Sequence, residues 1–144
     1  MLVVFAAGHG RTPFAQGVTA PTRSVWDGVY TQAQADRGEE AYKQRCSDCH
    51  GEDLGGDNDM ATPLAGGEFM SNWDGLTVGD LFERIRVTMP LNYPGPGTLS
   101  KETISDILAF VLSYNQFPAG QTELSRDKLV LKMITIQSKE PNRK

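Results

Sequence analysis

The stretch Cys46-Ser47-Asp48-Cys49-His50 places two cysteines three positions apart, with a histidine directly after the second. On a single helical turn, the two thiols can reach neighbouring edges of a porphyrin and add across its vinyl groups. The next residue is then directed at the iron from one face. This spacing is typical of covalent attachment of c-type haem. The chain has two cysteines, both in this stretch, and one other histidine, His9. His50 is therefore the predicted proximal ligand of the iron.

Three other uses of a C-x-x-C pair are open at this point. A thioredoxin-like dithiol needs a βαβ context, and the chain shows no such pattern. A structural zinc site needs four ligands, and the sequence has no second Cys/His cluster to supply them. A disulfide across two intervening residues would stabilise very little. We therefore favour covalent haem, one per chain.

Length and composition indicate one domain with a tail. The chain has 144 residues, is 39% apolar and contains 15 glycines, so long loops are expected and a buried porphyrin would supply apolar volume. Its net charge of −4 and its pI near 5.1, without a basic stripe, argue against a nucleic-acid partner. No run of 18 apolar residues is present, so the sequence predicts no membrane span.

The N-terminal segment, residues 1–24, is assigned to a leader. Residues 2–8 are apolar and residues 15–17 form a small-residue pattern like a cleavage site, although a positively charged start is missing. Because c-type haem is attached outside the cytoplasm, we interpret the segment as a signal peptide or its remnant. An ordinary disordered leader is the alternative. The expected location is the periplasm or another extracytoplasmic space.

The rest of the chain is divided into a domain over residues 25–120 and a C-terminal tail over residues 121–144, partly packed on that domain. A first helix is predicted over residues 32–46, where Thr31 can cap the N-terminus. Its apolar face includes Gly38, which costs about 1 kcal/mol relative to alanine in a helix interior. A close crossing with another helix would justify the glycine.

Two further amphipathic helices follow in the domain. The pattern Thr77-x-x-Asp80 is typical of a capping box, and the helix after it is expected to end before Pro90. Ser100 is the predicted cap of a third helix over residues 101–114.

The segments between the helices are interpreted as loops, and residues 18–31, before the first helix, are interpreted as an extended arm. Trp26 and Tyr30 are expected to pin the arm to the body. Residues 51–59 are rich in glycine and acidic side chains and read as a surface loop. Residues 63–73 are interpreted as a loop with apolar content, in which the N–H of Trp73 could serve a haem propionate. In the tail we expect a short helix from about residue 125, followed by an extended piece.

The second axial position of the iron would decide between electron transfer and ligand chemistry. A thioether ligand stabilises ferrous iron and suits electron transfer, whereas an open site suits binding or catalysis. Met89 is the preferred candidate because it ends the apolar stripe of its helix and Pro90 then breaks that helix. An ordinary core methionine is the alternative reading. The other candidates are Met60, Met70 and Met133, of which Met70 comes next after Met89, and Met60, in the acidic loop, is less favoured.

Gly38-x-x-x-Tyr42 before the Cys46–His50 motif, then Met89-Pro90, then an amphipathic C-terminal helix together resemble class I c-type cytochromes over residues 32 to about 115. The resemblance implies an all-α fold of about three main helices wrapped around one haem c, with His50 and Met89 as iron ligands. It also implies a proline whose carbonyl orients the proximal histidine, and Pro63 is the matching residue. Such a carbonyl would fix the imidazole ring and its basicity.

The resemblance implies a soluble one-electron carrier, and not an enzyme, that meets redox partner proteins. The residues around Trp26 and the closing tail resemble small bacterial periplasmic cytochromes that accompany quinoprotein-type dehydrogenases. Such a dehydrogenase is thus one candidate donor, and an oxidase or another cytochrome is the candidate acceptor. Two alternatives stay open: a haem sensor or peroxidase-like protein with an open distal site, and a fixed electron-transfer subunit of a larger dehydrogenase complex.

Overall fold

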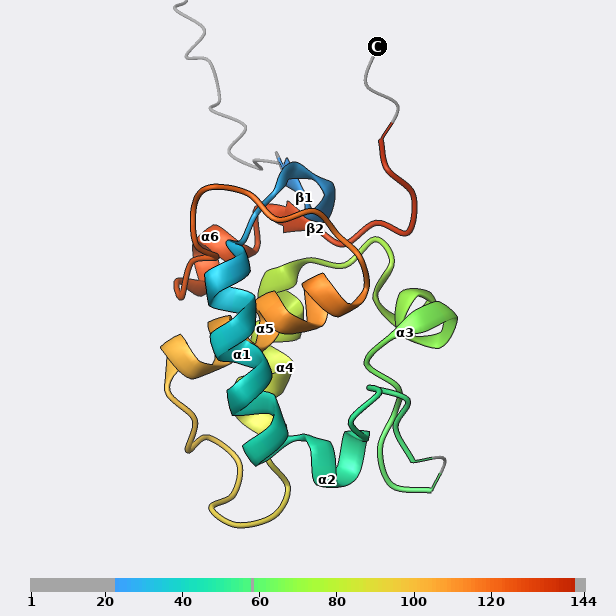
Figure 1. The fold of residues 1–144 in the computed structure, drawn as a ribbon, viewed down its shortest axis with the longest axis vertical. Coiled ribbons are helices and arrows are strands. Elements are labelled where there is room, and N and C mark those ends of the chain that lie inside the picture. The colour runs from blue at the N-terminus through green and yellow to red at the C-terminus, as the bar shows by residue number, and fades with distance from the viewer. Residues whose placement is uncertain (1–22, 58, 142–144) are drawn as a thin grey trace, which may run out of the picture.

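The computed structural model describes residues 23–57 and 59–141, and helices dominate them, as the sequence predicts (Figure 1). His9 and most of the predicted leader lie outside the described residues. In chain order the elements are β1 (Arg23–Ser24), the 3₁₀ helix η1 (Val25–Asp27), α1 (Gln32–Arg45), α2 (Ser47–His50), α3 (Gly66–Trp73), α4 (Val78–Thr88), α5 (Lys101–Tyr114), α6 (Lys128–Leu131) and β2 (Ile134–Thr135).

Helices α1 and α5 cross closely at the predicted glycine. The Thr31 side chain caps α1 by accepting a hydrogen bond from the Gln34 backbone N–H, and Ser100 caps α5 in the same way. A Cβ built on Gly38 would lie 1.8 Å from the carbonyl oxygen of Asp106 in α5. Only glycine therefore allows the two backbones to approach this closely, and the predicted crossing is confirmed.

Helix α4 begins and ends at the residues that the sequence indicates. Thr77 and Asp80 form a complete capping box, in which each side chain accepts a hydrogen bond from the other residue's backbone N–H. Met89 leaves the helix in an extended conformation, with φ −120° and ψ 152°. The residue before a proline avoids the α region, which explains why the helix stops there.

The expectation of a loop over the whole of residues 63–73 is wrong, because most of this segment forms helix α3. Residues 66–73 form a helix in which Phe69 is fully buried and Trp73, one turn later, is half-buried. The two glycines that open this helix have low helix propensity and conceal it in the sequence. Burial of the Phe69 face against the core outweighs that propensity.

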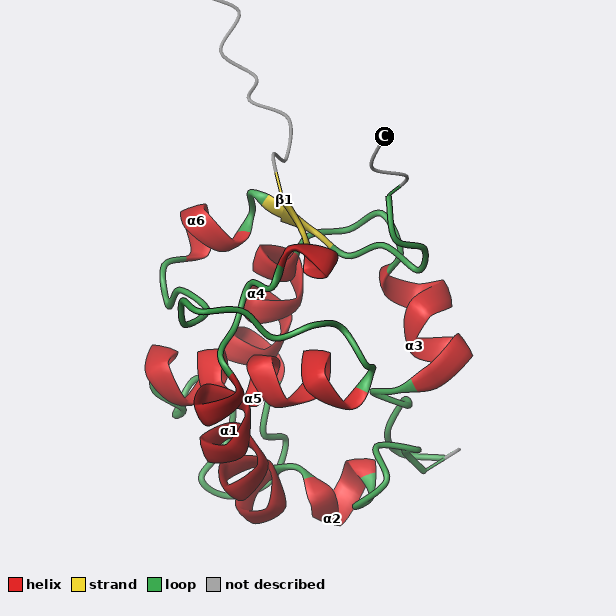
Figure 2. Ribbon diagram, turned by 45° about the horizontal axis from the view of Figure 1, so that its top comes forward, coloured by secondary structure: helices red, strands yellow, loops and turns green. Residues whose placement is uncertain are grey.

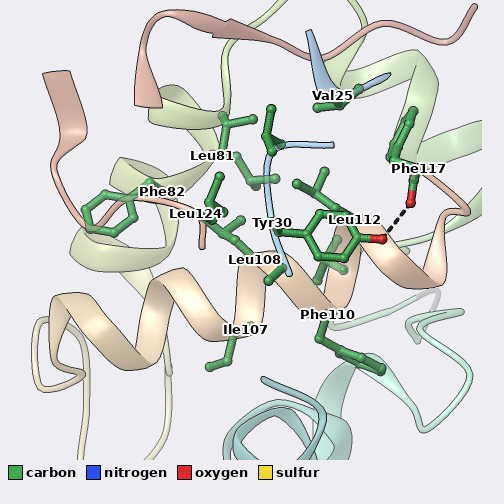
Figure 3. Close-up of a cluster of buried hydrophobic side chains, with 14 of the residues drawn as sticks. Val25, Tyr30, Leu81, Phe82, Ile107, Leu108, Phe110, Leu112, Phe117 and Leu124 are labelled. Carbon is green, nitrogen blue, oxygen red and sulfur yellow. Dashed lines mark hydrogen bonds between the residues drawn. The ribbon is translucent and has the colours of Figure 1, made fainter. Parts of the chain in front are cut away.

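The N-terminal arm is tied to the core by two aromatic side chains, as predicted. Figure 3 shows Tyr30 among apolar side chains of α4 and α5, with its hydroxyl donating to the carbonyl of Phe117. The Trp26 ring meets the Phe117 ring edge-on, with centroids 4.9 Å apart. The Trp26 indole N–H donates to the carbonyl of Gln137 at 2.9 Å. The arm thus holds the end of α5 and the C-terminal tail together.

The C-terminal tail is part of the folded body. It forms α6 and then β2, a short helix and an extended piece as predicted, and β2 pairs in parallel with β1. The two strands lie at the end of the molecule opposite α2 (Figure 1, Figure 2). Because β1 comprises Arg23 and Ser24, the folded body includes the last two residues assigned to the leader. Within the described residues, no helix is long and apolar enough to cross a membrane.

Candidate haem site

The attachment motif lies on a helical turn of its own, just after α1. Cys46 separates the two helices, with its N–H bonded to the Tyr42 carbonyl at 2.8 Å and its own carbonyl accepting from the His50 N–H at 2.9 Å. Both cysteines are free thiols and half-buried, so the structure does not support the disulfide alternative. Burial, reinforced by the neighbouring Cys49, raises the pKa of the Cys46 thiol to about 11, and the thiol is therefore neutral near pH 7.

A backbone carbonyl orients the imidazole ring of His50. The His50 side chain is only 8% exposed, and Nδ1 lies 2.9 Å from the carbonyl oxygen of Thr62. A carbonyl can only accept, so Nδ1 carries the proton in this bond and Nε2 keeps its lone pair. Ring orientation by such an acceptor is typical of metal-bound histidines.

The expectation that the carbonyl of Pro63 orients His50 is wrong, because the acceptor belongs to Thr62, one residue earlier. Pro63 acts on this carbonyl indirectly. A proline restricts the residue before it to extended conformations, so Pro63 limits the directions in which the Thr62 carbonyl can point. Sequence reasoning missed Thr62, and its place directly before a proline was the available signal.

The loop after the motif folds back to bring Thr62 to His50. Two backbone hydrogen bonds of 2.8 Å close it, from the Gly56 N–H to the His50 carbonyl and from the Leu64 N–H to the Leu54 carbonyl. Leu54 is fully buried, although the residues around it are mostly exposed, as expected for a surface loop. The Tyr42 hydroxyl adds a 2.7 Å bond to the Gly51 carbonyl, which fixes the start of the loop to α1.

The loop after Met89 reaches the attachment motif from α4. Asn92 Nδ2 lies 4.0 Å from Cys49 Sγ, so the chain three residues after Met89 is in contact with the second cysteine. Met89 itself is half-buried, and its N–H donates to the Ile85 carbonyl at 2.9 Å. Nothing in the sequence singles out Asn92, since a polar residue in a Pro/Gly-rich loop is common.

The other sequence-predicted site residues lie on different elements. Trp73 is half-buried at the end of α3 and packs against the core cluster, as does Met70 on the same helix. Met60 is 73% exposed in the loop that follows α2. In the part of the chain that the structure describes, no three His, Cys, Asp or Glu side chains gather as a metal site, which speaks against the zinc alternative.

The residues present fit a covalent haem. The segment offers two free thiols at the spacing that thioether attachment requires, and a buried imidazole whose Nε2 retains its lone pair. Cys46, Cys49 and His50 would hold the group. When bound, the haem supplies a one-electron couple between ferric and ferrous iron, which no side chain of the chain provides.

No curated protein matches the chain. The family described as cytochrome C oxidase, cbb3-type, subunit III matches residues 33–111, which is more than half of the chain. The matched span includes the attachment motif, α3, α4 and most of α5, whereas the arm, α6 and β2 lie outside it. The chain therefore belongs to this family of c-type cytochrome domains, has the all-α fold of a class I cytochrome and carries covalently bound haem c.

Proposed function

We propose that this chain transfers single electrons through a haem whose iron is held by His50 and Met89. The observation that carries the proposal is the 2.9 Å bond between His50 Nδ1 and the Thr62 carbonyl. It leaves Nε2 as the ring atom available to the iron and fixes the orientation of the ring. A ligand held in this way keeps its place when the iron changes oxidation state, so electron transfer requires little rearrangement.

Met89 is the proposed distal ligand because of where its helix ends. The side chain is half-buried directly after the last residue of α4, and the following loop contacts Cys49 through Asn92. Met60 is 73% exposed and Met70 packs against the core, which makes both weaker candidates. A thioether ligand stabilises ferrous iron and raises the reduction potential, as suits an electron carrier. The indole N–H of Trp73 is the proposed donor to a haem propionate.

The test of Met89 is optical. Ferric protein should show the weak red charge-transfer band of thioether-ligated iron, and Met89→Ala should abolish it. Met60→Ala is the matched control, because its side chain is exposed and its removal should leave the band unchanged. Loss of the band in Met70→Ala, with Met89→Ala unaffected, would assign the ligand to Met70. A wild-type protein without the band, together with tight carbon monoxide binding in the reduced state, would favour an open distal site.

A second candidate function is that of a fixed electron-transfer subunit. The family to which the chain belongs is described by an oxidase subunit, and this observation favours an assembled role. Redox partners of the proposed carrier include an oxidase or another cytochrome as acceptor and a quinoprotein-type dehydrogenase as donor. The proposed setting is extracytoplasmic, where c-type haem is attached. Isolation of the chain from its host in a stable complex would favour the subunit role, whereas a free monomer would favour the carrier.

A further inference from the structure

We propose that the C-terminal tail, residues 121–137, fixes the position of α4 and thereby determines how firmly Met89 is held at the iron. This inference rests on the proposed ligation by Met89. The tail lies outside the span of residues 33–111 that matches the family, so the family match does not describe its role. Its contacts with α4 occur in three kinds: backbone hydrogen bonds, backbone packing and ion pairs.

The backbone hydrogen bonds join the end of the tail to the residues just before α4. The Ile136 N–H donates to the Leu76 carbonyl at 2.8 Å, and the Gly75 N–H donates to the Ile136 carbonyl at 2.8 Å. Thr135 forms an antiparallel bridge with Thr77, the N-cap residue of α4. Ile136 is fully buried, so these bonds are shielded from water. The start of α4 is thus attached to the tail.

The first turn of α4 also packs directly against the end of α6. A Cβ built on Gly79 would lie 2.7 Å from the backbone nitrogen of Lys132 and 3.0 Å from the carbonyl oxygen of Lys128. The absence of a side chain at Gly79 therefore allows the two backbones to meet. Two ion pairs span the same contact, Lys132 with Asp80 at 4.0 Å and Lys128 with Glu83 at 3.7 Å. Because these charged side chains are 31–50% exposed and thus screened by water, packing contributes more to this contact than charge does.

The tail is itself anchored to the helices on either side of the core. Gln34 of α1, only 2% exposed, accepts from the Leu124 N–H at 2.6 Å and donates to the Leu124 carbonyl at 3.1 Å. Ser105 of α5 donates to the same carbonyl at 2.9 Å. Leu131 and Ile134 are also buried in the core cluster. The tail can therefore act as a fixed support for α4.

Met89 lies at the other end of the supported helix. Helix α4 has 11 residues and is about 16 Å long at 1.5 Å per residue. Its buried residues, among them Leu81 and Phe82 (Figure 3), lie in its first half, and the residues after Phe82 are at most half-buried. Beyond Met89 the chain is exposed, with Leu91 64% and Tyr93 98% accessible. The core therefore holds the last turn less firmly than the first, so a displacement of the first turn would move the last turn as well, and little beyond Met89 would resist that movement.

The experiment measures how easily free imidazole displaces the distal ligand in ferric protein. Gly79→Ala should improve the intrinsic helix propensity of α4 but force α4 and α6 apart. We expect it to bind imidazole roughly tenfold more tightly than the wild type and to weaken the charge-transfer band. Leu131→Ala should have the same effect, and Leu131→Met should restore most of the wild-type affinity. Leu129→Ala is the matched control for Leu131→Ala, because both residues lie on α6 but Leu129 is 72% exposed.

The variant Val29→Ala distinguishes a general loss of stability from a local effect at α4. Val29 is a buried residue of the arm. At equal loss of unfolding free energy, Val29→Ala should leave the imidazole affinity and the reduction potential near their wild-type values. Equal imidazole affinities for Leu131→Ala, Leu129→Ala and the wild type would overturn the role of the tail while leaving Met89 ligation intact. If the charge-transfer band of the wild type is still present in Met89→Ala, the ligation by Met89 on which the inference rests is wrong.

Discussion

Replacement of Gly38 by alanine is the most direct test of the helix crossing that supports the fold. The added Cβ would lie 1.8 Å from the Asp106 carbonyl oxygen, 2.4 Å from its carbonyl carbon and 3.0 Å from Phe110 Cβ. Cβ atoms in proteins essentially never approach closer than 3.0 Å, and the nearest atoms here are backbone. No rotamer change can therefore relieve the contact, and α1 and α5 must separate.

The magnitude follows from the required separation. The helices must move apart by at least 1.2 Å, the difference between 3.0 and 1.8 Å. A gap of about 1 Å already removes up to half of the dispersion energy across a contact, and overpacked cores lose about 1–3 kcal/mol or more. The gain in helix propensity offsets up to about 1 kcal/mol of this loss. We expect a net loss of about 2 kcal/mol, or a fall in Tm of about 7 °C.

The assay is urea unfolding of the ferric protein, followed by far-UV circular dichroism. Asp36, exposed on the same helix, provides the control for propensity. The difference between Asp36→Ala and Asp36→Gly gives the Ala/Gly preference of α1, because both variants lose the same 2.9 Å hydrogen bond from Gln32. After this correction, Gly38→Ala should still be strongly destabilised. A variant as stable as the wild type would show that the helices do not meet at Gly38.

Two further predictions concern α4. Thr77→Ala removes the cap of the helix and should lower the unfolding free energy by about 1 kcal/mol in the same urea assay. Thr77→Ser keeps the hydroxyl group and should therefore have an unfolding free energy close to that of the wild type. Glu83→Gln tests pH dependence: hydrogen bonding to Arg86 lowers the pKa of Glu83 from 4.5 to about 2, so its stabilising effect is present above pH 4.5 and is lost as the pH falls towards 2. The stability difference between wild type and Glu83→Gln should therefore shrink between pH 4.5 and 2, and a constant difference would contradict the ion pair.

Much of the fold could be predicted because local chemistry determined it. Caps and helix ends depend on a few neighbouring residues, so Thr31, Thr77 and Pro90 located the ends of α1 and α4 to within a residue. Gly38 indicated a crossing because a helix interior otherwise disfavours glycine. The attachment motif indicated the cofactor because its spacing matches one known chemistry.

The missed features depend on contacts between distant segments. Helix α3 opens with two glycines, and it is stabilised by contacts with the distant core, chiefly the burial of Phe69. The bond from His50 to Thr62 depends on how a loop of mostly exposed residues folds back, which the periodicity of the sequence does not encode. The place of the tail beside α4 likewise depends on Gly79, a residue whose neighbours lie about fifty positions away.

The two proposed iron ligands, His50 and Met89, differ in how strongly the chain holds them. His50 is buried and bound through its ring nitrogen, its N–H and its carbonyl, to Thr62, Cys46 and Gly56. Met89 has one backbone bond, to Ile85, and an exposed loop follows it. Local opening is easiest where buried contacts are fewest. Mild destabilisation should therefore release the distal ligand before the proximal one, and the potential and the optical band should change before the helices unfold.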